Sequence, residues 1–268
     1  MASFSVVTNI SASNAQANLG VSNQGLQKAI NRLSSGLRIN SAGDDAAGLS
    51  VANSYRNQQA VLVQGTRNAN DGMSALQIKD GALSNISTLL DRLTTLASQS
   101  GSAASDVDRT QLNNEFQDVL SEIDREAGVA KIKSGDASLA FSVFVSAGTD
   151  GTVTGTIGAA DKTTLGIGTQ TITTAALAAT AVDKIAKAVT SLGASQGTIG
   201  ALQNRLQFAI SLSQSQTVST RAAESRIRDA NMAEESANMT RFNILSQSGI
   251  AALAQANQQS SSILTLLR

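Results

Sequence analysis

The residue types that most often carry enzyme chemistry are scarce in this chain of 268 residues. It contains no His, Cys, Trp or Pro and a single Tyr. Without imidazole and thiol groups, the chain cannot build a Ser-His or Cys-His catalytic constellation, a thiolate metal site or a disulfide. Only carboxylates remain for acid–base catalysis or for binding a hard metal ion.

The most suggestive pair of carboxylates is Asp44-Asp45. Neighbouring aspartates can bind a divalent cation, but aspartate is also common at the start of a helix, where it accepts hydrogen bonds from free N–H groups. We expect the capping role, because no Asp/Glu cluster has the spacing of a calcium loop. The Gly-rich residues 148–168 lack the pattern of a phosphate-binding loop. The sequence therefore predicts no enzyme, no catalytic residue, no metal site and no cofactor.

The charges of the chain balance, with 20 basic and 20 acidic residues. This balance gives no electrostatic reason to expect nucleic acid or a membrane surface as a partner. The distribution is uneven, because no acidic residue precedes Asp44 and none follows Glu235. Both ends are therefore weakly charged, and we expect them to pack together.

Apolar residues recur at coiled-coil spacing in both end segments. The pattern predicts a helix over residues 18–37 and another from residue 232 to the end. Neither has another obvious partner, so we expect the first helix to pair with the last. Their apolar residues are the predicted self-assembly seam: Leu19, Leu26, Ile30, Leu33 and Leu37 in the first helix, and Phe242, Leu245, Ile250, Leu253, Ile263 and Leu266 in the last.

The middle of the chain predicts further long helices. Apolar residues at 4-3 spacing predict a helix over residues 44–99, with Lys79 as the polar residue in its seam. Gly65, Gly72 and Gly81 are expected to weaken this helix locally. Similar patterns predict helices over residues 106–126 and from 178 to about 231.

Residues 130–178 are different in kind, since Gly and Thr dominate them. The apolar run 139–145 and the alternating run 152–157 flank the turn Asp150-Gly151, which predicts a β-hairpin. We therefore predict a mainly α fold of long coiled-coil helices, in which a terminal helix pair and a helical hairpin bundle carry a small β-hairpin insert.

Several stretches at the two ends resemble the bacterial flagellins. They occur in the order that the family shows, and the similarity covers roughly residues 1–128 and 180–268. The matching stretches are LSSGLRINSAGDDAAGL at 33–49, RNANDGMS at 67–74, SRIRDA at 225–230, LAQANQ at 253–258 and ILTLLR at 263–268.

This resemblance implies a structural subunit that polymerises into the extracellular flagellar filament for swimming motility. The alternative is a flagellin-like adaptor at the hook–filament junction. The insert is short, so the chain is similar to flagellins that lack large outer domains. The implied domains are an inner-core coiled coil (1–43 and 232–268), an outer-core helical domain (44–130 and 178–231) and a variable insert (131–177).

The resemblance also implies partners and a location. Flagellins are secreted through the flagellar type III apparatus, and an export chaperone holds their carboxy-terminal helix, here around residues 250–267. Hook-associated and cap proteins are further implied partners. An animal Toll-like receptor binds some family members through outer-core helices, and the matching positions are Arg92, Leu96 and Glu115.

Overall fold

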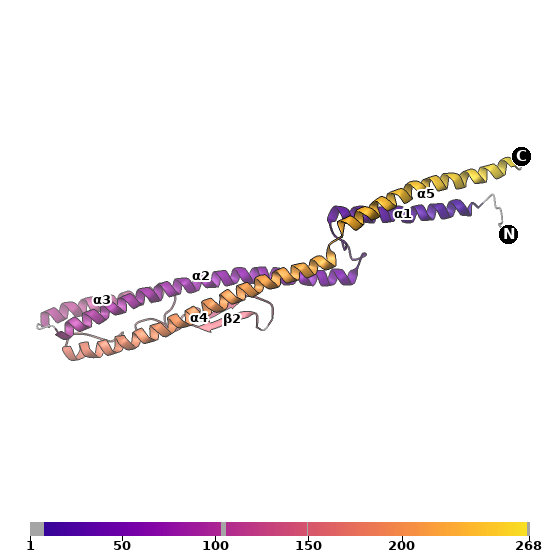
Figure 1. Ribbon diagram of the computed structural model, residues 1–268. Coiled ribbons are helices and arrows are strands. Elements are labelled where there is room, and N and C mark those ends of the chain that lie inside the picture. Colours follow the sequence, from indigo (N-terminus) through magenta and orange to yellow (C-terminus); the bar gives the residue numbers. More distant parts are fainter. Residues whose placement is uncertain (1–7, 103–105, 149, 267–268) are drawn as a thin grey trace. The chain divides into compact units, whose positions relative to one another are not determined.

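The computed structural model describes residues 8–102, 106–148 and 150–266 (Figure 1). The predicted mainly α fold is confirmed, including the terminal helix pair and the small β-hairpin. None of the described helices combines the length and the hydropathy that a membrane span needs. In chain order the elements are α1 (Ile10–Ser35), α2 (Ala46–Ser102), α3 (Asp106–Val129), the short 3-10 helix η1 (Ala137–Leu139), β1 (Ala140–Phe144), β2 (Thr152–Thr156), α4 (Ala175–Arg228) and α5 (Met232–Leu266).

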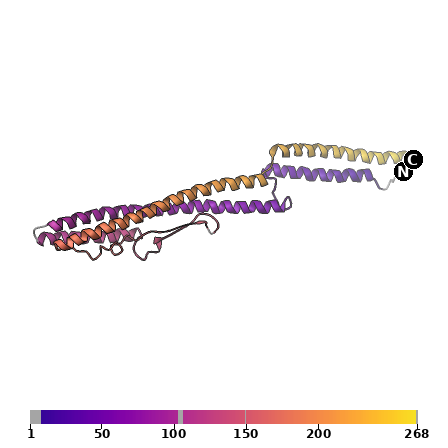
Figure 2. The same cartoon turned by 60° about the horizontal axis from the view of Figure 1, so that its bottom comes forward.

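The chain packs as two compact units. The first unit ends at Asn57 and resumes at Thr220, and in it α1 and α5 lie side by side (Figures 1 and 2). The second unit is Gln58–Ser219, which holds α3, the hairpin and most of α2 and α4. This division follows packing alone, so the three functional domains implied by the sequence stay a prediction.

The core of the second unit is a seam shared by α2, α3 and α4. On α2 the predicted 4-3 positions from Leu76 to Ala97 are all buried. Phe116, on α3, is the largest of the fully buried side chains, and on α4 a buried row extends from Ile185 to Ile210. Such long helices depend on packing along their length, because isolated helices are marginal in water.

Lys79 is the one charged residue in the α2 seam, and it is only 6% exposed. Its Nζ donates to the carbonyl O of Ser138 at 2.6 Å and lies 3.1 Å from the Ser138 Oγ. Burial lowers the pKa of this ammonium group, and the carboxylate of Asp136 opposes the shift. Lys79 therefore ties α2 to η1, the short helix that leads into β1.

The β-hairpin packs closely against the helices, through its backbone at one glycine of α2 and through side chains at another. β1 and β2 are antiparallel, with Val143 opposite Val153. Close approach to α2 requires Gly65, since a Cβ there would lie 1.6 Å from the carbonyl O of Val145. At Gly72 a Cβ would lie 2.7 Å from a methyl group of Val143. The glycines expected only to weaken α2 thus include two that admit the hairpin, whereas Gly81 faces open space.

The α1 helix begins at Ile10, eight residues earlier than the predicted start. Asn9 caps it, because its side chain accepts a hydrogen bond from the Ala12 N–H at 3.0 Å. The polar residues of this first part hide its periodicity in the sequence. The helix ends where Gly36 adopts a left-handed φ of 72° and its N–H returns to the Arg32 carbonyl, a common way for a helix to terminate.

Candidate functional site

The α1–α5 pair is held in antiparallel register by polar contacts along its length. The Asn9 Nδ2 donates to the Ala256 carbonyl at 2.9 Å. Near the middle, the Ser246 Oγ donates to the Asn23 Oδ1 at 2.9 Å. At the other end an Arg32 Nη1 lies 3.1 Å from the Glu235 Oε1. Each contact joins residues more than 200 positions apart in sequence, so the pair brings the two end segments of the chain together.

Two glycines let the helices of this pair approach closely. The ring of Phe242 sits on Gly25, where a Cβ would lie 2.5 Å from a ring carbon. In the same way Leu19 packs on Gly249, where a Cβ would lie 3.2 Å from a Leu19 methyl carbon. Sequence periodicity predicted Leu19 and Phe242 as seam residues but missed the glycines, which carry no apolar signal.

The predicted seam residues are only partly covered by the pair. Leu19, Leu26, Leu33, Leu37, Phe242 and Leu253 are half-buried. By contrast, Ile30 is 41% exposed, Leu245 42% and Ile250 58%. The side chains of Ile263 and Leu266 lie outside the described part of the structure.

A groove of about 380 Å³ lies between the two helices. Leu19, Leu245 and two alanines contribute its apolar surface, and it is also lined by Gly249 and by serine and asparagine side chains such as Ser22. Ala29 is the only buried residue of α1. The pair thus leaves much of its apolar surface uncovered, which is unusual for a helix pair with no other partner.

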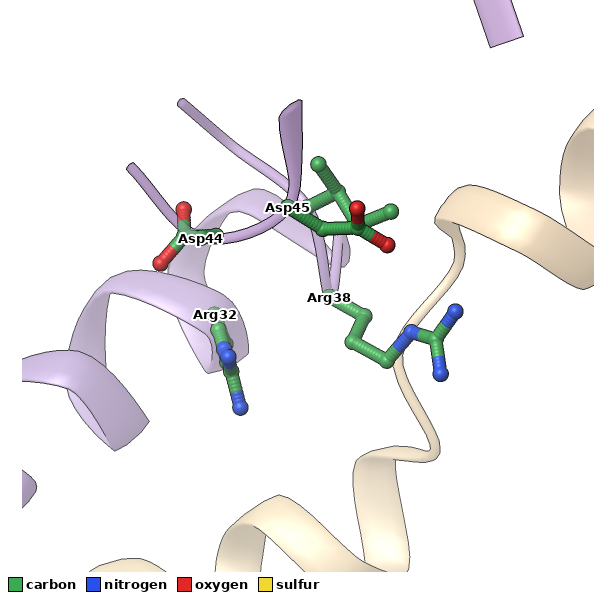
Figure 3. Close-up of a pocket in the computed structure, with 5 residues that line it drawn as sticks. Arg32, Arg38, Asp44 and Asp45 are labelled. Carbon is green, nitrogen blue, oxygen red and sulfur yellow. The ribbon is translucent and has the colours of Figure 1, made fainter. Parts of the chain in front are cut away.

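A second candidate site lies at the loop that joins α1 to α2, close to the start of α5, and Figure 3 shows it. A pocket of about 210 Å³ is lined by the buried Ile39 and by four charged residues, namely Arg32, Arg38, Asp44 and Asp45. The Asp45 Oδ1 accepts from the Gly48 N–H at 2.8 Å and caps α2, as the sequence predicted.

Asp44 folds back on the loop before it instead of capping α2. Its Oδ2 accepts from the N–H of Ser41 at 3.0 Å, from the Ser41 hydroxyl at 3.0 Å and from the N–H of Asn40 at 3.3 Å. The Ser41 N–H, and then its hydroxyl, lower the pKa of the Asp44 carboxyl below its usual value. Both aspartates therefore have structural roles in this loop.

The α1–α2 and α4–α5 connections are joined backbone to backbone. The Arg38 N–H donates to the Arg228 carbonyl at 2.7 Å, and the Ala230 N–H donates to the Gly36 carbonyl at 2.9 Å. The guanidinium of Arg38 also donates to the Ile227 carbonyl at 2.8 Å. Figure 3 shows the Arg38 side chain pointing toward that connection. These backbone links between distant segments left no signal in the sequence.

The three residues singled out for receptor recognition do not share one surface. Arg92 on α2 and Glu115 on α3 are exposed and form an ion pair, with the Arg92 Nε 2.9 Å from the Glu115 Oε1. Leu96 is fully buried in the core of the second unit. The structure therefore brings Arg92 and Glu115 together and places Leu96 beneath the surface.

Comparisons with known proteins agree on one family. The model of the bacterial flagellin N-terminal helical region matches residues 6–132, and that of the C-terminal helical region matches residues 182–267. A flagellin from Halalkalibacterium halodurans is 38% identical over 268 residues, which covers 97% of this chain and 98% of that protein. The flagellar filament 33 kDa core protein of Treponema phagedenis is 35% identical, with the same coverage of both chains.

A flagellin from Bacillus subtilis is 32% identical over 300 residues and covers 97% of this chain and 98% of that protein. Among solved structures, Bacillus cereus flagellin aligns with a TM-score of 0.49 and 27% identity. That alignment covers 55% of this chain and 88% of the other.

Proposed function

This chain belongs to the bacterial flagellin family, and from that premise we propose how its helices build a filament. It is a structural subunit that polymerises into the flagellar filament. The family is structural rather than enzymatic. The relatives described above are filament proteins and give no support to the hook–filament adaptor alternative.

The exposed apolar surface of the α1–α5 pair carries the proposal. Burying apolar surface is the main favourable term in protein association, and Ile30, Leu245 and Ile250 remain uncovered within the subunit. We propose that these residues, with the other predicted seam residues, contact the terminal helices of neighbouring copies. Contacts between different surfaces that do not close into a ring generate a helical filament.

The domain assignment follows from the same proposal. The terminal pair would form the inner core of the filament, the α2–α3–α4 bundle the outer core and the short hairpin insert the variable part. The backbone links between Gly36, Arg38, Arg228 and Ala230 support a defined junction within the first unit. Small shifts between two packing arrangements of such helices would change the helical shape of the filament.

Further partners follow from the family and are proposals for this chain. Secretion by the type III apparatus places the assembled protein outside the cell. An export chaperone would hold α5 around residues 250–267 before assembly, and hook-associated and cap proteins would contact the filament ends. Co-purification of the chaperone with the full chain but not with a chain lacking residues 253–268 is the expected result. Equal recovery with both would contradict the chaperone site.

For the animal Toll-like receptor, Arg92 and Glu115 are the accessible residues, and buried Leu96 would act by supporting α2 beneath them. Arg92→Ala is expected to weaken receptor activation by soluble subunits. Arg125→Ala is the matched control, since Arg125 is also an exposed arginine paired with a glutamate, Glu122. An equal response to both variants would remove Arg92 from the proposed surface.

Removal of residues 253–268 tests the filament role of the terminal pair. The truncated chain should form no filaments in electron micrographs, because α5 loses the end that carries Leu253, Ile263 and Leu266. The second unit does not use these residues, so its thermal unfolding should be unchanged. Filaments of normal length from the truncated chain would refute the proposal.

A further inference from the structure

Three Asp-Gly pairs occur in this chain, and they lie in two different kinds of backbone. Asp71-Gly72 and Asp80-Gly81 lie inside α2, whereas Asp150-Gly151 lies between β1 and β2. All three aspartates are exposed. The pairs therefore share the same residue chemistry and the same access to water, and they differ in how the backbone holds them.

An aspartate followed by glycine can rearrange without an enzyme. The main-chain nitrogen of the glycine attacks the side-chain carboxyl carbon of the aspartate, a new N–C bond forms and one water leaves. Glycine favours this step because it has no Cβ to hinder the approach. Water then opens the resulting succinimide ring. Opening at the side-chain carbonyl restores aspartate, and opening at the main-chain carbonyl yields isoaspartate, so the net change is an isomerisation.

The α2 helix holds its two pairs in a geometry that cannot close this ring. Inside a helix the glycine N–H is donated to the carbonyl four residues before, and the aspartate has helical dihedral angles. Ring closure needs the glycine nitrogen to turn toward the aspartate side chain, so the helix must first open locally. Leu76 lies between the two pairs and is fully buried, so opening α2 here would uncover the core of the second unit.

The turn between the strands holds its pair less firmly. Asp150-Gly151 lies outside both strands, since β1 ends at Phe144 and β2 begins at Thr152. The Gly151 N–H donates to the Gly148 carbonyl at 3.2 Å, which is the upper end of the ordinary range for such a bond. Breaking this one long hydrogen bond frees the attacking nitrogen without opening a helix.

We propose that Asp150 is a site of spontaneous isoaspartate formation in the folded chain, and that α2 protects Asp71 and Asp80 from the same reaction. The reaction consumes one water and releases one water, so it needs no oxidant, cofactor or second protein. The inference goes beyond the proposed function and does not depend on polymerisation.

The turn has no room for the product in its present form. In isoaspartate the main chain runs through the side chain, which adds one methylene group between the Asp150 Cα and the Gly151 nitrogen. Gly151 is buried, and a Cβ on it would lie 1.8 Å from the Ser146 carbonyl O. The Gly151 carbonyl accepts the N–H groups of Val145 at 2.7 Å and of Ser146 at 3.1 Å. Isoaspartate at residue 150 should therefore break these two hydrogen bonds and loosen the end of the hairpin.

Peptide mapping of the full-length soluble chain, aged for weeks in warm neutral buffer, tests the proposal. Trypsin cleaves after lysine and arginine, which places the three pairs in separate peptides, 68–79, 80–92 and 134–162. Isoaspartate has the same mass as aspartate, so electron-transfer fragmentation is used to identify it and to locate it within each peptide. It should form at residue 150 at least about tenfold faster than at residues 71 and 80, because a helix in the core opens rarely.

Two controls separate the local backbone from the residue chemistry. Asp150→Glu keeps the exposed charge, but its longer side chain cannot close the same ring, so no isomerised residue should form at this position. In the chain unfolded in guanidinium chloride, the three pairs should react at similar rates. Hydrogen exchange of the aged folded chain should show the Val145 and Ser146 amides losing protection as isoaspartate accumulates, and Asp150→Glu should keep that protection.

The outcomes decide each part of the proposal. Equal amounts of isoaspartate in the three peptides of the folded chain would overturn the protection by α2. Its absence at residue 150 of the folded chain, in an experiment where the unfolded chain forms it, would overturn the proposed site. Unchanged protection of the Val145 amide in chains that carry isoaspartate would overturn the loosening of the hairpin. None of these results would alter the proposed filament function.

Discussion

The contact between α2 and the hairpin predicts opposite effects of one substitution at two glycines of the same helix. Gly81→Ala should stabilise the chain, because Gly81 faces open space and alanine favours the helix by about 1 kcal/mol. Gly65→Ala gains the same helix preference but places a Cβ 1.6 Å from the Val145 carbonyl O. Two atoms cannot share that space, so the hairpin must move away from α2.

The cost at Gly65 follows from what the hairpin loses. Val145 is 4% exposed, and uncovering a buried valine costs about 1.5–3 kcal/mol. The hydrogen bond from the Asn68 Nδ2 to the Phe144 carbonyl, 3.1 Å long, is worth about 1 kcal/mol. After the helix gain is subtracted, Gly65→Ala should lower the free energy of unfolding by about 2 kcal/mol.

Urea unfolding of the two variants, followed by far-UV circular dichroism at concentrations too low for polymerisation, measures this difference. Hydrogen exchange should show the Val145 amide, which donates to the Gly151 carbonyl, losing protection in Gly65→Ala alone. A Gly65→Ala variant as stable as Gly81→Ala would refute the close approach of the hairpin to α2.

Two further predictions concern buried charge and the terminal pair. The pKa of Lys79 is lowered in the folded state, so near the ordinary lysine value of 10.5 the unfolded chain binds more protons than the folded chain. The free energy of unfolding of wild type should therefore rise, relative to that of Lys79→Met, as the pH approaches this value. Urea unfolding of both proteins between pH 7 and 10 measures the two free energies, and a fall in wild type relative to Lys79→Met would contradict the burial of Lys79. In α1, Gly25→Ala should displace the Phe242 ring and reduce amide protection in α5, whereas Gly20→Ala, where no other part of the described chain is near, should not. Equal protection in both variants would mean that Phe242 does not sit on Gly25.

Periodicity predicted the helices because burial along a seam imposes a 4-3 spacing on the sequence. The positions from Leu76 to Ala97 were found in this way. The two strands of the hairpin were found from an apolar run and an alternating run on either side of a turn. The start of α1 was missed because polar residues dilute its apolar spacing. The partners of Lys79 and Gly65 could not be predicted, because Ser138 and Val145 are more than 50 positions away and their contacts use backbone atoms.

The functional surfaces were predictable to different degrees. The spacing of apolar residues predicts which residues of α1 and α5 form the seam. It does not predict how exposed each one is, because that depends on which face of each helix contacts the other. Arg92 and Glu115 lie in helices predicted to be adjacent, yet only the packing shows that they pair and that Leu96 is buried beneath.

Seeded polymerisation, observed by electron microscopy, tests the central claim most directly. Purified full-length chain is added to short filament fragments in mildly precipitating salt, and filament length is followed with time. The account predicts that the fragments lengthen into long, hollow filaments built from this chain. Fragments of unchanged length beside folded, monomeric chain would contradict its role as a filament subunit.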